Sequence, residues 1–224
     1  MISMTSDGCY LDNDVVLKTC AYGVGADLVK MSTCGTLVPA ILALAKYTLC
    51  STVRRSRTIV DQSTAANQLC ELLDRVRLLE PTPDEIMAAA ELESAAMAAN
   101  LSFDAGESQL VAMLIARNGL VFISGDKRAA KAISEILPEL ERRLACLEQV
   151  MHTLVTDLGL DPIRRAVCRE VNADRATAIC FQCASPQVDA AAVQSALVSY
   201  TNALRSDTGS LLVEGAGVSL TKIA

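Results

Sequence analysis

The sequence has few aromatic residues and a single histidine. Aromatic residues make up 3% of its 224 residues, and none of them is tryptophan. A Ser/His/Asp or Cys/His catalytic centre would have to use His152, and no supporting motif surrounds that residue. Hydrophobic residues nevertheless make up 51% of the chain, so we expect an aliphatic core and exclude a disordered chain.

The sequence also lacks a basic excess and a long apolar run. Its net charge of −6 gives no general basic surface for nucleic acid, although bound divalent cations can hold phosphates at an acidic site. The most apolar run, residues 37–49, is too short to span a bilayer and contains Pro39 and Lys46. Residues 1–9 lack the basic and then apolar pattern of a signal peptide. We therefore expect a cytoplasmic protein without membrane association.

The chain has nine cysteines, an odd number, and several of them lie in apolar runs. We expect free thiols in a reducing compartment. Cys180 and Cys183 form an isolated C-x-x-C motif, and only Cys146, Cys168 and His152 are available to complete a zinc site. We interpret the motif as part of a buried helix face.

Short apolar stretches alternate with helical patterns over the first 140 residues. This alternation predicts an α/β fold with a parallel sheet, followed by a helical appendage. Strands are expected near residues 9–12, 36–39, 75–79 and 120–124, with a last strand or a tail at 211–214. Helices are expected at 14–22, 39–53, 64–73, 82–99, 104–118, 129–158 with an interruption at Pro138, 161–171 and 185–204.

Acidic residues lie at the expected junctions between these elements. Asp12 and Asp126 follow predicted strands, and Asp104 and Glu107 lie at a predicted helix start. Ligands of parallel α/β sheets bind beyond the carboxyl ends of the strands. Carboxylates that converge there repel one another unless a cation lies between them, and oxygen ligands of this kind suit Mg²⁺ or Mn²⁺. Such ions can activate water for phosphodiester hydrolysis.

Three short segments resemble the acidic signatures of PIN-domain nucleases: LDNDV at residues 11–15, DAGE at 104–107 and SGDKR at 124–128. Members of this family are metal-dependent ribonucleases, and many are toxins of toxin–antitoxin modules. The resemblance implies a Rossmann-like short parallel sheet flanked by helices in a nuclease domain over residues 1–145. Residues 146–224 would then be a helical extension packed on that domain.

The resemblance also implies the roles of individual residues. Asp12, Asp104, Glu107 and Asp126 would be the catalytic residues and the ligands of Mg²⁺ or Mn²⁺. Single-stranded RNA would be the substrate, rather than DNA. Lys127 and Arg128 adjoin the proposed metal site and are the candidates for binding the substrate phosphates. An inhibitory protein partner and a homo-oligomer formed through the Ala- and Leu-rich helices are further expectations.

One departure from the family pattern leaves an alternative open. The family places a glutamate on the helix after its second strand, but residues 39–46 read PAILALAK and contain no acid. Asp14 or Glu107 could take that place. Otherwise the chain would be a catalytically degenerate PIN-like protein that acts as a binding or scaffold subunit.

A second alternative is a haloacid-dehalogenase-like phosphatase. The DND sequence at residues 12–14 would then supply Asp12 as the nucleophile and Asp14 as the general acid. Ser124 would match the Ser or Thr of that family, but Gly125 and Asp126 follow it at once, so one short stretch would have to serve two motifs.

Each acidic residue also has a purely structural interpretation. Asp104 with Glu107 forms an ordinary capping box, and Asp126 can cap the helix that begins at Lys127. Asp12 is harder to explain in this way, because a carboxylate at the end of a buried strand needs a partner.

Overall fold

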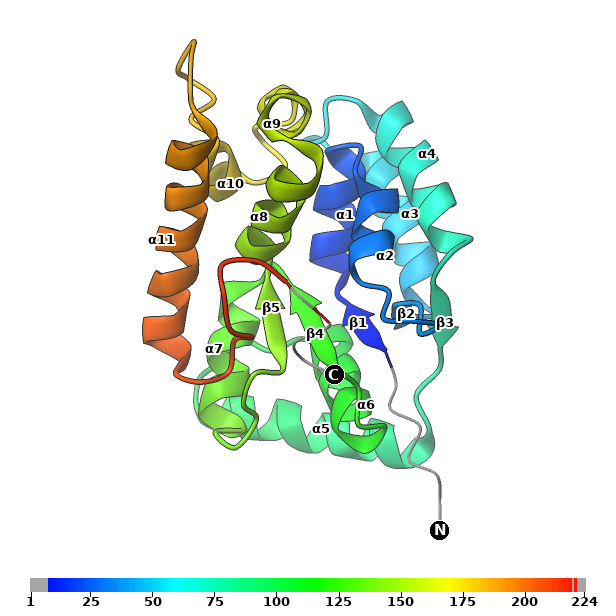
Figure 1. Ribbon diagram of the computed structural model, residues 1–224. Helices are drawn as coiled ribbons and strands as arrows, with labels where there is room; N and C mark the ends of the chain where they lie inside the picture. Colours follow the sequence, from blue (N-terminus) through cyan, green and yellow to red (C-terminus); the bar gives the residue numbers. More distant parts are fainter. Residues whose placement is uncertain (1–7, 219, 221–224) are drawn as a thin grey trace.

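A sheet of five short parallel strands lies at the centre of the molecule (Figure 1). The computed structural model describes residues 8–218 and residue 220. The strands are β1 (Cys9–Leu11), β2 (Ala40–Leu42), β3 (Arg77–Leu79), β4 (Val121–Ser124) and β5 (Leu144–Cys146), in the order β3-β2-β1-β4-β5. All four pairings are parallel, which confirms the predicted Rossmann-like α/β class.

The central strands are buried on both faces. Every residue of β1 has 0% exposure, and β4 is buried along its whole length. Helices cover both faces of such a sheet, so its strands are continuous apolar runs rather than alternating ones. The register pairs Leu11 with Ile123, which brings the carboxyl ends of β1 and β4 side by side.

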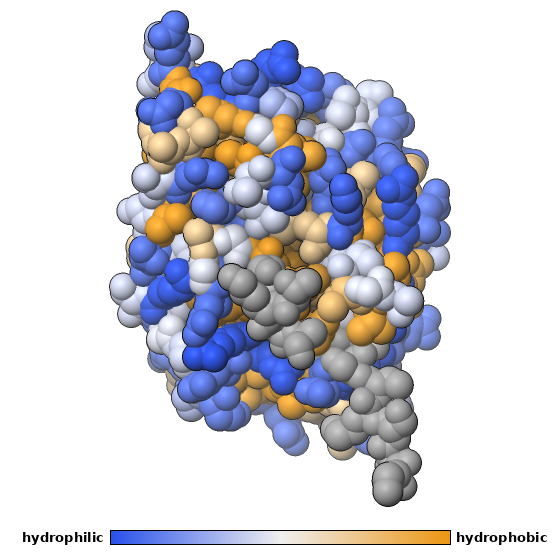
Figure 2. All heavy atoms as spheres, in the orientation of Figure 1, coloured by the Kyte–Doolittle hydropathy of each residue, from blue (hydrophilic) through white to orange (hydrophobic). Residues whose placement is uncertain are grey.

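Most of the helices form two groups that lie next to each other above the strands in Figure 1. On one side, α1 (Asn13–Ala21), α2 (Gly25–Met31), α3 (Ala45–Arg55) and α4 (Gln62–Leu73) pack on one another. Beside this group, toward the β5 edge of the sheet, lie α8 (Leu147–Leu158), α9 (Leu160–Arg169), α10 (Arg175–Cys180) and α11 (Ala190–Thr208), and α11 packs on α8 and on α7 (Lys127–Ile136). The face in Figure 2 is largely hydrophilic, with smaller hydrophobic patches between the polar side chains.

Helices α5 (Pro83–Ala98) and α6 (Ala105–Ala116) pack against each other on the opposite side of the strands, below them in Figure 1. Both begin where the sequence predicts. Thr82 accepts a hydrogen bond from the Glu85 amide at 3.3 Å, and the Glu85 side chain accepts one from the Thr82 amide at 2.7 Å. Such a reciprocal capping box satisfies two amides that the first turn leaves without partners.

Three predicted elements were wrong. The second strand lies at residues 40–42 rather than 36–39, and helix α3 begins at Ala45 rather than at Pro39. The Pro39 carbonyl accepts a hydrogen bond from the Arg77 amide, so the apolar run enters the sheet after the proline. The helical pattern predicted over 129–158, with an interruption at Pro138, is also wrong at residues 144–146, which form β5.

Two differences concern the C-terminal part. Helix α11 begins at Ala190, capped by Asp189, rather than at residue 185. Leu212 forms an isolated parallel bridge with Leu144, so residues near it lie against β5. Strand β5 itself spans residue 145, where the sequence suggested a boundary between nuclease domain and extension. Residues 1–7, 219 and 221–224, which include most of the segment searched for a signal peptide, lie outside the described residues.

The expectation that all cysteines are free thiols is also wrong. Cys168 and Cys183 form a disulfide. Of the C-x-x-C motif, Cys180 is buried as predicted, whereas Cys183 pairs with the more distant Cys168. In the described part of the chain, no helix is long and apolar enough to cross a membrane.

Candidate functional site

Asp12 lies at the carboxyl end of β1 and at the start of α1. Its amide donates to the Ile123 carbonyl of β4 at 2.9 Å, and its carboxylate accepts a hydrogen bond from Ser124 Oγ at 2.7 Å. The residue is only 7% exposed. Burial raises the pKa of Asp12 to about 6, and the hydrogen bond from Ser124 opposes this rise. Ser124 is therefore the partner that a buried carboxylate needs at this position.

Asp126 lies two residues beyond the end of the neighbouring strand and caps α7. Its amide donates to the same Ser124 hydroxyl at 3.1 Å. Its carboxylate accepts hydrogen bonds from the Arg128 amide at 2.8 Å and from the Arg128 guanidinium at 2.6 Å. Burial favours a higher pKa for Asp126, but the hydrogen bonds from Arg128 hold it below its ordinary value. Ser124 thus connects the two strand ends that carry Asp12 and Asp126.

Asp104 and Glu107 form the predicted capping box of α6. Asp104 Oδ1 accepts from the Glu107 amide at 2.9 Å, and Glu107 Oε2 accepts from the Asp104 amide at 3.0 Å. Glu107 is only 5% exposed, whereas Asp104 is exposed. Burial raises the pKa of Glu107 to about 8, and the charges of Asp104, Asp12 and Asp126 act in the same direction. The capping interpretation is therefore confirmed for this pair, and the pKa of Glu107 responds to the charges of Asp12 and Asp126.

Asp14 belongs to a separate ion-pair network. Its carboxylate is 2.7 Å from the ammonium of Lys18, which is also 2.7 Å from Asp174. A Cβ atom on Gly125 would lie 2.3 Å from Asp14 Oδ2, so only glycine leaves room for this carboxylate. No pattern in the sequence indicates that Asp174, in the C-terminal part, lies here. Its one local signal is its place before a short helix, where it caps α10.

The two predicted substrate-binding cations are engaged with carboxylates of the protein. Lys127 Nζ lies 2.8 Å from buried Glu148 and 4.8 Å from the centre of the Tyr200 ring. Arg128 pairs with Asp126, and its side chain is 74% exposed. Arg128 is consequently the better placed of the two to exchange its partner for a phosphate.

The donor set can be compared with the needs of a divalent cation. Asp12, Asp104, Glu107 and Asp126 supply only oxygen atoms, which are the ligands that Mg²⁺ and Mn²⁺ prefer. The influence of three of these charges on the pKa of Glu107 places all four in one electrostatic environment. Within residues 8–218 and residue 220, however, no three or more His, Cys, Asp or Glu side chains are arranged to hold a metal ion. The four carboxylates are suitable ligands for the cation by their chemistry. In this structure their oxygen atoms accept hydrogen bonds from other groups of the protein.

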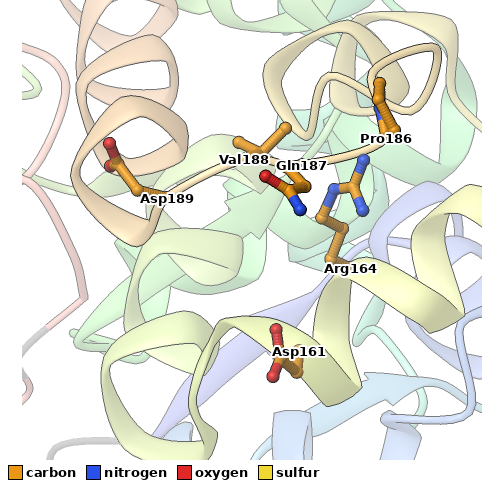
Figure 3. A pocket seen from close by; sticks show the side chains of 6 residues that line it. All are labelled: Asp161, Arg164, Pro186, Gln187, Val188 and Asp189. Atoms are coloured by element: carbon orange, nitrogen blue, oxygen red, sulfur yellow. The ribbon is translucent and has the colours of Figure 1, made fainter.

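Two surface hollows differ in their relation to these residues. One, of about 470 Å³, lies at the carboxyl ends of β2 and β3, and its lining includes Gln109 of α6, two residues after Glu107. The other, of about 540 Å³, lies between α9 and the segment that leads into α11 (Figure 3). Its lining contains Arg164 but none of the four candidate carboxylates. Gln109 brings the first hollow to α6, the helix that carries Glu107, but none of the four candidate carboxylates lines either hollow.

Comparisons with known proteins identify no relative of this chain. No family model matches the sequence, and neither a curated protein nor a solved structure matches it. Any statement about activity consequently depends on the residues and their arrangement.

Proposed function

We propose that this protein is a metal-dependent endonuclease that hydrolyses phosphodiester bonds, with single-stranded RNA as its substrate. The observation that carries the proposal is the buried Glu107, whose pKa is raised to about 8 beside Asp12, Asp104 and Asp126. A buried acid among other acids is unfavourable for stability, and functional sites are where such arrangements are found. The choice of RNA rests on the resemblance of three short segments to PIN-domain nucleases.

In this proposal the four carboxylates would hold Mg²⁺ or Mn²⁺, and the ion would supply an activated water and charge stabilisation for the phosphate. Ser124 keeps Asp12 and Asp126 in fixed positions through its hydroxyl. Glu107 holds the start of α6 through its bond to the Asp104 amide. Arg128, which pairs with Asp126 and is largely exposed, would bind a substrate phosphate. The remaining predictions are a cytoplasmic location, an inhibitory protein partner and a homo-oligomer.

A degenerate, non-catalytic binding protein is the second candidate. Two observations favour it: helix α3 contains no acid, and the candidate carboxylates are all hydrogen-bonded within the protein. Such a protein would bind its partner without cleaving it.

The phosphatase alternative has less support. It requires Asp14 to donate a proton to a leaving group, whereas Asp14 accepts a hydrogen bond from Lys18 at 2.7 Å.

The test of the proposal is cleavage of labelled single-stranded RNA and DNA with Mn²⁺ or Mg²⁺. We expect Asp12→Asn and Asp126→Asn to lower the rate by about 100-fold or more, because each removes a ligand charge from the site. Asp189→Asn is the matched control, since Asp189 also caps a helix but lies at the start of α11. Equal cleavage by wild type and both site variants would refute the site. Metal binding without cleavage of either nucleic acid would favour the binding protein.

A further inference from the structure

The disulfide closes a short loop in the C-terminal part of the chain. It joins Cys168, near the end of α9, to Cys183, just beyond α10, with a Cα–Cα distance of 5.2 Å. We refer to residues 168–183 as the 168–183 loop. No feature of the proposed nuclease chemistry uses it.

The loop carries a buried carboxylate that contacts a distant part of the chain. Glu170 has 0% exposure, and its two oxygens accept hydrogen bonds from the amides of Val60 and Asp61, each at 2.7 Å. These residues form the turn before α4. Because each amide donates to Glu170, their protection from solvent reports whether this part of the loop is docked.

A second carboxylate of the loop contacts α1. Asp174 caps α10 through the Thr177 amide at 2.7 Å and lies 2.7 Å from Lys18 Nζ. Lys18 also binds Asp14, whose carboxylate lies against Gly125, the residue between Ser124 and Asp126 of the candidate site. The loop therefore reaches the ion-pair network that adjoins the site.

The two cysteines of the disulfide are more accessible than most of the others. Both are partly exposed. Four other cysteines are buried, and burial raises the pKa of each thiol to about 12, which suppresses the reactive thiolate: Cys9, Cys20, Cys146 and Cys180. Burial thus restricts thiol exchange to a few positions, and among these only Cys168 and Cys183 form a disulfide.

The loop has one further attachment, which does not depend on the disulfide. Arg164 of α9 donates to the carbonyls of Phe181 and Gln182, each at 3.1 Å, and to that of Ser185 at 2.5 Å. Figure 3 shows this side chain extending from α9 toward the segment that contains Pro186 and Gln187. Reduction of the disulfide therefore leaves the end of the loop attached, while the cross-link near Glu170 is lost.

We propose that Cys168 and Cys183 are a reversible oxidation site that controls the docking of Glu170 and Asp174. The oxidant is a low-molecular-weight disulfide of the glutathione class. One cysteine thiolate attacks it and forms a mixed disulfide, and the second thiolate then displaces the remaining small thiol. The two protein sulfurs lose two electrons, the reagent gains two, and the two protons pass to the released small thiols.

Hydrogen exchange of the Val60 and Asp61 amides tests this inference in the full-length protein. We expect exchange to become about tenfold faster when the disulfide is reduced, and equally fast in the Cys168→Ser/Cys183→Ser double variant without reductant. Cys70→Ser, a change at an exposed free cysteine, is the matched control and should exchange like the oxidised wild type. Unchanged exchange in both the reduced protein and the double variant would overturn the proposal.

A titration with oxidised and reduced glutathione tests reversibility, with alkylation and mass measurement of the peptides that contain Cys168 and Cys183. We expect one transition between the two states within the range of cellular ratios. A pair that stays fully oxidised or fully reduced over that range would contradict reversible control. Neither readout uses RNA or a metal ion, so a failure of the proposed nuclease activity and a failure of this inference can be distinguished.

Discussion

Two groups of carboxylates lie close together in this molecule and differ in what neutralises them. Asp14 and Asp174 share the ammonium of Lys18, with both distances at 2.7 Å. Asp12 and Glu107 are more deeply buried, and among the residues that the structure describes none forms an ion pair with either. The pairing of Asp14 and Asp174 with Lys18 can be explained by its contribution to stability alone. A buried group without a counter-charge requires protons or a cation, and this difference is the main argument for a functional site.

The largest expected effect comes from breaking the loop that supplies Asp174. The Cys168→Ser/Cys183→Ser double variant should lower the free energy of unfolding by about 3 kcal/mol, the loop-closure entropy expected for a loop of this size. Urea denaturation of the oxidised wild type and of the variant measures the difference. A variant as stable as the oxidised wild type would show that the cross-link does not stabilise the part of the fold that holds Asp174 beside Lys18.

Removal of the shared cation should have the next largest effect. Lys18→Gln leaves Asp14 and Asp174 close together without a counter-charge, and we expect a loss of about 2 kcal/mol because both carboxylates are partly exposed. Lys131→Gln is the matched control. Its pair with Glu135 is 3.9 Å long and well exposed, so the loss there should be below about 0.5 kcal/mol. Equal losses for the two variants would mean that Lys18 stabilises its carboxylates no more than an exposed surface ion pair does.

The pH dependence of stability should distinguish the second group. Burial raises the pKa of Glu107 from its ordinary value of 4.5 to about 8. The folded protein therefore holds this proton more tightly than the unfolded chain, so the contribution is complete below about pH 4 and is lost as pH rises toward 8. In metal-free protein we expect stability to fall by on the order of 2 kcal/mol over this window. Glu107→Gln should remove most of that slope, and a slope unchanged in the variant would place its origin elsewhere.

The sequence predicted the candidate site better than the ion-pair network of Lys18. Asp12 and Asp126 follow continuous apolar runs, and such runs become adjacent parallel strands whose ends must meet. Glu107 was visible as a capping residue, and its burial came only from packing. Asp174 could not be found, because its partner Lys18 is far away in the sequence and a capping aspartate has no local mark of an ion pair.

The missed elements have similar physical reasons. Residues 144–146 are Leu, Ala and Cys, which suit a helix as well as a strand, and the neighbouring strand β4 decides between them. The second strand was predicted too early in the sequence, because the apolar run after Pro39 forms first a strand and then a helix with no polar residue to mark the boundary. The disulfide depends on the approach of two segments that only the folded chain brings together.

The central claim is that the uncompensated carboxylates hold a divalent cation. Calorimetric titration with Mn²⁺ at pH 7, in two buffers of different ionisation enthalpy, tests it most directly. We predict binding with release of about one proton, because Glu107 is protonated before binding and must ionise to become a ligand. Glu107→Gln should abolish the proton release, and Asp12→Asn should weaken binding. Absence of binding heat in both buffers, or binding that the two variants leave unchanged, would contradict the account.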